Sequence, residues 1–191
     1  MGLPKSIMRI VNKEEFTLYQ QEMLEYLQEG KLFVYPTDTI YGIGCDATNA
    51  EAVAKVRVAK SRPNNPFSVI APSKEWIVQH CDVTEEQLAQ LPGPVTIVAK
   101  LYNPHVIAHN VSGNQSIGVR IPDHWMSDVI KAFGKPIITT SVNKQGEEYA
   151  KEIDGIHSEI KGKIHIAISE GELIGRPSRI VNTLNNETIA R

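Results

Sequence analysis

Residues 36–44 form the first of three polar segments whose side chains could bind a small polar ligand. The segment contains two threonines, one aspartate and two glycines, and it directly follows the apolar run 32–35. In open α/β sheets, ligands bind beyond the carboxyl ends of strands, so hydroxyls and glycines at this place suit such a ligand. Threonine, aspartate and glycine are also common in ordinary turns, and a plain strand-exit turn is the alternative interpretation.

Residues 60–66 form the second segment, and its charges suit an anion. Lys60 and Arg62 lie two residues apart, just past a predicted helix, in a stretch that Pro63 keeps extended, so both cations could point toward one polyanion. An ammonium and a guanidinium are usual partners of phosphate groups. Cations at a helix C-terminus also interact favourably with the helix dipole, which is the commoner role of an isolated pair. The proline- and asparagine-rich segment that follows supplies no side chain to a core. This favours the phosphate-binding interpretation over the helix-dipole one.

Residues 139–143 form the third segment, again at the end of a predicted strand. Ser141 and Asn143 project to the same side, and short hydroxyl and amide groups orient a phosphate or a ribose without adding charge. An Asx or Ser turn is the alternative. Arg120 lies on an apolar strand and needs an anionic partner if it is buried. The segment 175–179 adds a further hydroxyl between two arginines.

Common nucleotide-binding, hydrolase and metalloprotease motifs are absent from the sequence. His105 and His109 are four residues apart without a nearby carboxylate, so we expect them to face solvent rather than a metal. Cys45 and Cys81 form no C-x-x-C pair. Ser141 lacks the flanking glycines of a hydrolase nucleophile. The sequence therefore predicts no metal site built from side chains and no protein nucleophile.

Helical and extended patterns alternate along the chain and predict an α/β fold. Apolar residues at helical spacing predict a first helix that ends at about Glu29, before Gly30. Asn49 caps a second helix that ends before Pro63, and residues 144–163 could be helix or mobile loop. Many short strands without intervening helices favour a twisted mixed sheet, parallel and antiparallel, flanked by helices. The predicted strands are 32–35, 67–71, 95–100, 117–121, 137–140, 164–168 and 179–183. Three further helices are predicted: one begins at Ser73, one begins at Thr84, and one spans about 125–133.

The composition predicts one globular domain over residues 1–191, because 191 residues with 41% hydrophobic content can bury a core without disulfides. Residues 1–9 do not resemble a signal peptide, and no run of about 18 apolar residues predicts a membrane span. We therefore expect a cytoplasmic protein. A net charge of −2 lacks the overall basicity of an obligate nucleic-acid binder, although a local basic patch would remain compatible with it.

Six segments in this order make the chain resemble, over nearly its whole length, the YrdC-domain family of threonylcarbamoyl-AMP synthases. These segments are 35–47 (YPTDTIYGIGCDA), 60–63 (KSRP), 92–96 (PGPVT), 117–123 (IGVRIPD), 140–143 (TSVN) and 176–178 (RPS). The resemblance implies a YrdC-like fold with a large concave cavity. Long members carry an extra C-terminal domain and this sequence stops at Arg191, so it resembles the short, single-domain type.

The resemblance also implies a reaction. L-threonine, bicarbonate or CO₂, and ATP with Mg²⁺ would give threonylcarbamoyl-AMP and diphosphate. That intermediate would serve the threonylcarbamoylation of the adenosine next to the anticodon in tRNAs that read codons beginning with A. Separate threonylcarbamoyl-transferase proteins would perform the transfer and are the expected partners.

The family's motifs imply roles for individual residues by position. Lys60 and Arg62 would be the catalytic residues, and the ATP-binding residues would be Lys60, Arg62, Asn64, Ser116, Ser141, Asn143 and Tyr149. The threonine-binding residues would be Thr37, Arg120, Thr139 and Ser178. The sequence departs from the family pattern at three places without losing a polar contact, and these departures affect the shape of the cavity: Ser61 replaces a glycine, Val142 an alanine and Leu91 a tryptophan.

A nucleic-acid-binding module of the same fold, without synthase activity, is the alternative function. Lys55, Arg57, Lys60 and Arg62 form a short basic stretch that could contact tRNA or double-stranded RNA. The acidic pI of about 6.3 argues against nucleic-acid binding as the main role. A diverged paralogue without activity would be expected to lose the Lys-x-Arg and Ser-x-Asn sets, which this sequence keeps.

Overall fold

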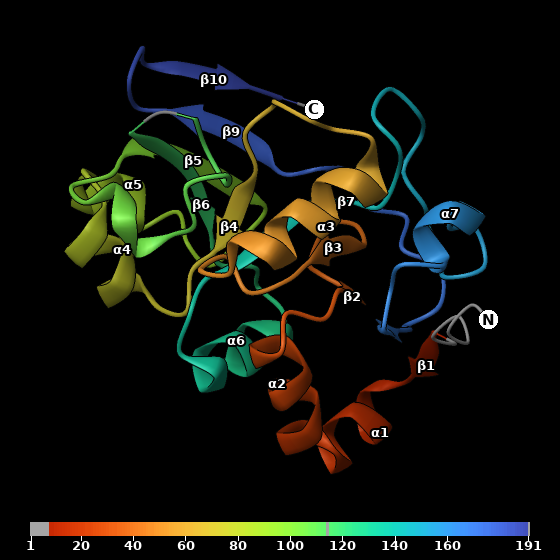
Figure 1. Cartoon of the computed structure of the whole chain (residues 1–191). Helices are drawn as coiled ribbons and strands as arrows, with labels where there is room; N and C mark the ends of the chain where they lie inside the picture. The colour runs from red at the N-terminus through yellow and green to blue at the C-terminus, as the bar shows by residue number, and fades with distance from the viewer. Residues whose placement is uncertain (1–7, 114, 191) are drawn as a thin grey trace.

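The computed structural model describes residues 8–113 and 115–190, which form a ten-stranded sheet with flanking helices (Figure 1). Residues 1–7, where the sequence predicts no signal peptide, lie outside this description. The strands are β1 (Arg9–Val11), β2 (Phe33–Tyr35), β3 (Gly42–Gly44), β4 (Ser68–Ile70), β5 (Val95–Lys100), β6 (Ser116–Arg120), β7 (Ile137–Ser141), β8 (Ile166–Ile168), β9 (Arg179–Asn182) and β10 (Glu187–Ile189). The helices are α1 (Lys13–Leu18), α2 (Gln20–Gln28), α3 (Ala50–Lys60), α4 (Lys74–His80), α5 (Glu85–Leu88), α6 (Met126–Phe133), α7 (Ser158–Lys161) and the 3₁₀ helix η1 (Pro104–Val106).

The sheet mixes both strand directions, as the sequence predicts. Its order is β1-β8-β2-β3-β7-β4-β6-β5-β9-β10. The pairs β1/β8, β2/β8, β4/β6 and β5/β9 are parallel, and the other five pairs are antiparallel. The pair β3/β7 joins the first four strands of this order to the remaining six.

Two hydrophobic clusters cover the sheet. One contains the buried residues of α3, α4 and α7. The other contains those of α1, α2 and α6. In Figure 1, α3 crosses in front of the central strands, whereas α1, α2 and α6 lie together below them. The strands that carry the polar segments are therefore packed on both sides by hydrophobic residues.

Local capping signals place several helix starts where the sequence predicts them. The Asn49 side chain accepts a hydrogen bond from the backbone N–H of Ala52, at 3.1 Å, and begins α3. Ser73 caps α4, and Thr84 and Gln87 form the predicted capping box of α5. These short-range contacts satisfy backbone donors that a helix N-terminus otherwise leaves without partners.

Three predictions about elements are wrong. The first helix is two helices, α1 and α2, which meet at Tyr19 in a non-helical conformation. Lys60 is the last residue of α3 rather than a residue beyond it. Residues 36–44 are not all loop, since β3 occupies their end and pairs with β2 and β7. Glycines usually weaken a strand, but a Cβ on Gly44 would lie 1.9 Å from the carbonyl oxygen of Ile138, so the close approach of β3 and β7 requires glycine there.

Other elements are not evident from the sequence pattern. The edge strands β1 and β10 and the helix η1 were not predicted. Residues 144–163, whose sequence is compatible with helix or loop, consist of turns followed by the four-residue helix α7. His105 and His109 are exposed, as expected, and Cys45 and Cys81 are buried free thiols. Over the described part of the chain, every helix is too short or too polar to cross a bilayer.

Candidate active site

A pocket of about 140 Å³ lies over the central strands and contains much of the predicted site. Six predicted site residues line it: Thr37, Arg62, Arg120, Thr139, Ser141 and Ser178. They come from five segments that are far apart in the sequence. The volume is below the roughly 300–1,000 Å³ of common ligand pockets, so the large concave cavity implied by the resemblance stays a prediction.

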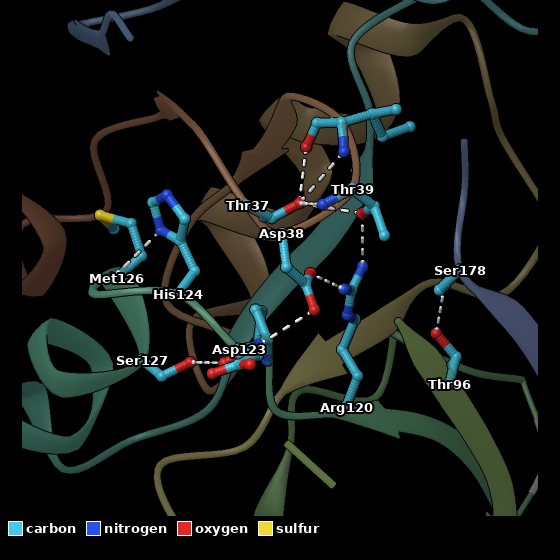
Figure 2. A network of polar contacts seen from close by, with 12 residues as sticks. Thr37, Asp38, Thr39, Thr96, Arg120, Asp123, His124, Met126, Ser127 and Ser178 are labelled. Carbon is cyan, nitrogen blue, oxygen red and sulfur yellow. Dashed lines mark hydrogen bonds and ion pairs between the residues drawn. The ribbon is translucent and has the colours of Figure 1, made fainter. Parts of the chain in front are cut away.

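The wall of the pocket is rich in hydroxyl groups. Eight serine and threonine residues line it, of which sequence reasoning did not assign four: Thr39, Ser68, Thr96 and Thr140. Ser68 and Thr96 face the pocket partly because position 118 is glycine. A Cβ there would lie 2.3 Å from the Ser68 hydroxyl oxygen. The Thr96 and Ser178 hydroxyl oxygens are 2.7 Å apart in a buried hydrogen bond that orients Ser178 (Figure 2).

The Thr37 hydroxyl organises the turn that follows β2. It donates to the carbonyl oxygen of Ile40 at 2.7 Å and accepts from the backbone N–H of Thr39 at 3.2 Å. Its oxygen also lies 3.0 Å from the Thr39 hydroxyl. The turn interpretation of this segment is therefore confirmed for Thr37, while its side chain lines the pocket as well.

Arg120 at the end of β6 has the anionic partner that its burial demands. Its Nη2 donates to Oδ1 of Asp38, and its Nη1 lies 3.3 Å from the Thr39 hydroxyl oxygen (Figure 2). The second Asp38 oxygen accepts the backbone N–H of Asp123 at 3.0 Å. The side chains of Arg120 and Asp38 are only 6% and 10% exposed, so the pair is sheltered from solvent. The sequence predicted the need for a partner but did not identify Asp38.

Lys60 is buried and points at its own chain. Its Nζ donates to the carbonyl oxygen and the side-chain oxygen of Asn143, both at 2.9 Å, and to the carbonyl oxygen of Ser141. The Ser141 hydroxyl donates to the same Asn143 side chain at 2.6 Å. Burial, with the nearby charge of Arg62, lowers the pKa of Lys60 to about 7, while the three acceptors favour its charged form. Lys60 therefore holds the turn at 141–143 and does not extend past the helix toward solvent.

Arg62 brings positive charge to the pocket wall. Its Nη2 donates to the carbonyl oxygen of Pro66 at 2.6 Å, and its Nη1 lies 3.4 Å from the Thr140 hydroxyl oxygen. Its Cζ is 5.1 Å from the centre of the Phe67 ring, within cation–π range. Arg62 and Arg120 are the charged residues among those that line the pocket, and both are cations.

Five predicted ATP contacts, the buried Lys60 among them, lie outside the pocket lining. The side-chain oxygen of Asn143 accepts hydrogen bonds from Lys60 and from Ser141, and Ser141 lines the pocket. Asn64 is exposed on the loop after α3, and Ser116 begins β6. The Tyr149 hydroxyl donates to the carbonyl oxygen of Gly175 at 3.3 Å. The structure thus brings together the threonine-side residues with Arg62 and Ser141, and the wider nucleotide site stays a prediction.

The basic stretch 55–62 is not a continuous cationic surface. Lys60 is 2% exposed, and the Arg57 guanidinium donates to backbone carbonyl oxygens of its own chain. Lys55 is exposed. This arrangement weakens the nucleic-acid-binding alternative, which needs several charges on one solvent-facing surface.

Comparison with known proteins finds relatives that match most of the chain. A model of the Sua5, YciO and YrdC family, described as telomere recombination, matches residues 25–191. The threonylcarbamoyl-AMP synthase of Vibrio campbellii is 35% identical over 172 residues, covering 84% of this chain and 91% of that protein. That of Aliivibrio fischeri is 31% identical over 180 residues, covering 88% and 96%.

Solved structures share the fold. The crystal structure of P. abyssi Sua5 complexed with L-threonine has a TM-score of 0.82 and 26% identity, covering 95% of this chain and 56% of that chain. This chain thus spans little more than half the length of that protein. The crystal structure of E. coli YciO has a TM-score of 0.78 at 18% identity, covering 96% and 92%, and supports the fold alone.

Proposed function

This chain belongs to the Sua5, YciO and YrdC family, and we propose that it is a threonylcarbamoyl-AMP synthase that serves tRNA modification. It would convert L-threonine, bicarbonate or CO₂, and ATP into threonylcarbamoyl-AMP and diphosphate. The observation that carries this proposal is the pocket itself, whose charged lining residues are two arginines among eight serine and threonine residues. The threonine carbamate carries two anionic groups and one hydroxyl, so its chemistry matches this wall.

Arg120 would bind the carboxylate of threonine. It is fixed by Asp38 and Thr39, so its orientation is set before the substrate arrives. Ser178, oriented by Thr96, and Thr139 would contact the polar groups of the amino acid. The side chains of Ile40 and Phe67 supply the apolar part of the same wall.

The reaction needs positioning and charge rather than a protein nucleophile. A carbamate oxygen would form a bond to the α-phosphorus of ATP, the bond from that phosphorus to the bridging oxygen would break, and diphosphate would leave with the electron pair. Two anions must approach each other for this step. Arg62 on the pocket wall would offset their repulsion, and the turn that Lys60 holds would place Ser141 and Asn143 beside the nucleotide.

Mg²⁺ would enter this reaction bound to ATP. Across residues 8–113 and 115–190, no group of three His, Cys, Asp or Glu side chains could hold a metal ion. Mg²⁺ commonly binds nucleotide phosphates and keeps several of its waters. We therefore assign it to ATP rather than to a site in the protein. Asn64, Ser116 and Tyr149 would contact the nucleotide outside the pocket, and separate transferase proteins would carry the product to tRNA.

The decisive experiment is incubation with ATP, L-threonine, bicarbonate and Mg²⁺, followed by chromatography for diphosphate and a new adenylate. Diphosphate release is expected to require both threonine and bicarbonate, because the nucleophile is made from them. Matched reactions that omit threonine or bicarbonate serve as controls. Equal ATP turnover in these controls would identify a plain hydrolase and exclude the synthase.

A further inference from the structure

We propose that Arg57 is a positioning residue, which holds the loop 61–66 in the shape that turns Arg62 toward the pocket. Arg57 lies one turn before the end of α3 and does not line the pocket. Its effect on the reaction would therefore pass through Arg62. This inference rests on the proposed function insofar as it assigns Arg62 to ATP.

The Arg57 guanidinium ties three segments together. Its Nη1 donates to the carbonyl oxygens of Arg62 and Asn65, at 3.0 and 2.9 Å, which are near the two ends of the loop. Its Nε and Nη2 donate to the carbonyl oxygen of Asn110, at 2.9 and 2.6 Å. Nη2 also lies 3.3 Å from the carbonyl oxygen of Val111. One side chain thus fixes both ends of the loop against the segment 110–111.

The same contacts position the ring on which Arg62 rests. The Arg57 Cζ is 4.5 Å from the centre of the Phe67 ring, and the Arg62 Cζ is 5.1 Å from it. The Phe67 backbone N–H donates to the carbonyl oxygen of Val111 at 3.0 Å. Arg57 therefore contacts the loop that carries Arg62, the segment that anchors Phe67, and Phe67 itself.

These contacts require a guanidinium. Five donor contacts in a plane reach four separate carbonyl oxygens, whereas a lysine ammonium presents three donors from a single atom. Among the described residues Arg57 forms no ion pair, and its hydrogen-bond acceptors are backbone carbonyls. Its role is accordingly to shape the backbone and not to neutralise a carboxylate.

The test is a double-mutant cycle with Arg57→Ala, Arg62→Ala and the double variant, measured by ATP-dependent diphosphate release. Arg57→Ala is expected to raise the KM for ATP about tenfold or more and the KM for threonine less, since the loop that carries Arg62 loses its place while Phe67 keeps its backbone hydrogen bond to Val111. The double variant should be within about threefold of Arg62→Ala, because two residues acting through one contact are not additive. Lys55→Ala, an exposed cation of the same helix, is the matched control.

Arg57→Lys keeps the charge, loses the fork and guards against simple unfolding of the alanine variant. We expect it to stay at least about fivefold impaired in the KM for ATP while its melting temperature is close to that of the wild type. Recovery to wild-type values would show that charge acts and overturn the inference. An Arg57→Ala effect that multiplies with that of Arg62→Ala, or a normal Arg57→Ala enzyme beside an impaired Arg62→Ala enzyme, would also overturn it. A normal Arg62→Ala enzyme would instead remove the proposed ATP contact, and the inference with it.

Discussion

The two cationic regions of the pocket are held by different chemistry. Arg120 pairs with the largely sheltered carboxylate of Asp38, so much of its charge is already balanced. The region around α3 uses neutral oxygens: Lys60 donates to carbonyl and amide oxygens, and Arg57 donates to backbone carbonyls. Neutral acceptors orient a cation without cancelling its charge. The α3 side therefore keeps a positive potential for a polyanion, while the Arg120 side is suited to recognising one small carboxylate.

Removing Arg62 should have the largest effect. Loss of one charged phosphate contact is expected to cost about 2–4 kcal/mol at the transition state, roughly thirtyfold to nine-hundredfold in rate. Lys60→Ala should be similarly severe, because it releases the turn that carries Ser141 and Asn143. Lys55→Ala, measured in the same diphosphate assay, should remain close to wild type.

If the Lys55 and Lys60 variants instead weaken RNA binding equally and lower its salt dependence, the nucleic-acid function is favoured.

Asp38→Asn tests the balanced side of the comparison. It leaves Arg120 buried without its carboxylate, so the free energy of unfolding in urea is expected to fall by roughly 2–3 kcal/mol, and the KM for threonine should rise. Glu22→Gln, which removes the exposed ion pair with Arg9, should change stability by less than about 1 kcal/mol. Equal effects of the two variants would show that the Asp38–Arg120 pair is as weak as a surface pair.

Amino-acid selectivity sharpens the description of the Arg120 side. The polar contacts treat serine and threonine alike, so discrimination rests on one methyl group against apolar atoms, worth roughly 1–3 kcal/mol. Serine should be a poor but detectable substrate. Valine leaves the hydroxyl-binding groups without a partner and should be rejected more strongly. Relative rates for the three amino acids check this, and valine reacting faster than serine would place the hydroxyl contacts elsewhere.

The pH dependence of stability tests how neutral oxygens hold Lys60. Its pKa is about 7 in the folded protein, below the ordinary value of 10.5. Above pH 7 the folded state releases the proton and the unfolded state keeps it, so the free energy of unfolding should rise with pH toward 10.5. The gain in the free energy of unfolding, measured relative to Lys60→Met, should be roughly 1–2 kcal/mol. It is smaller than the lowered pKa alone would give, because the three acceptors favour the charged form. A difference that stays flat over this range in urea titrations would show that Lys60 remains charged.

Ser61→Gly should give the smallest effect. Ser61 ends α3 with φ of 51°, in the left-handed region where a side chain is strained and glycine is favoured. The glycine variant is expected to raise the free energy of unfolding by about 0.5–1 kcal/mol with little change in activity. A drop in stability would mean that the serine side chain makes a compensating contact.

Local signals in the sequence predicted much of the fold, and long-range pairings limited the rest. Asn49, Ser73 and Thr84 start helices through contacts within three residues, so the sequence reveals them. Asp38 and Arg120 are 82 residues apart, and the need for a partner could be predicted while its identity could not. Lysine side chains are rarely buried, so the sequence pattern predicts that Lys60 is exposed to solvent and does not indicate its burial. The six motifs nevertheless contain most of the residues that line the pocket, while Pro66, Phe67, Ser68 and Thr139 lie outside them.

The glycine contact between β3 and β7 has a consequence for how the molecule opens. The pocket lies on the strand pair that links the two parts of the sheet, and β3 and most of β7 are buried. Backbone amides in such a central pair exchange with solvent only when the protein unfolds extensively. The floor of the pocket should therefore be among the slowest-exchanging parts of the protein, while the exposed loop 61–66 should exchange quickly. Any motion that admits ATP would then leave these strands at rest.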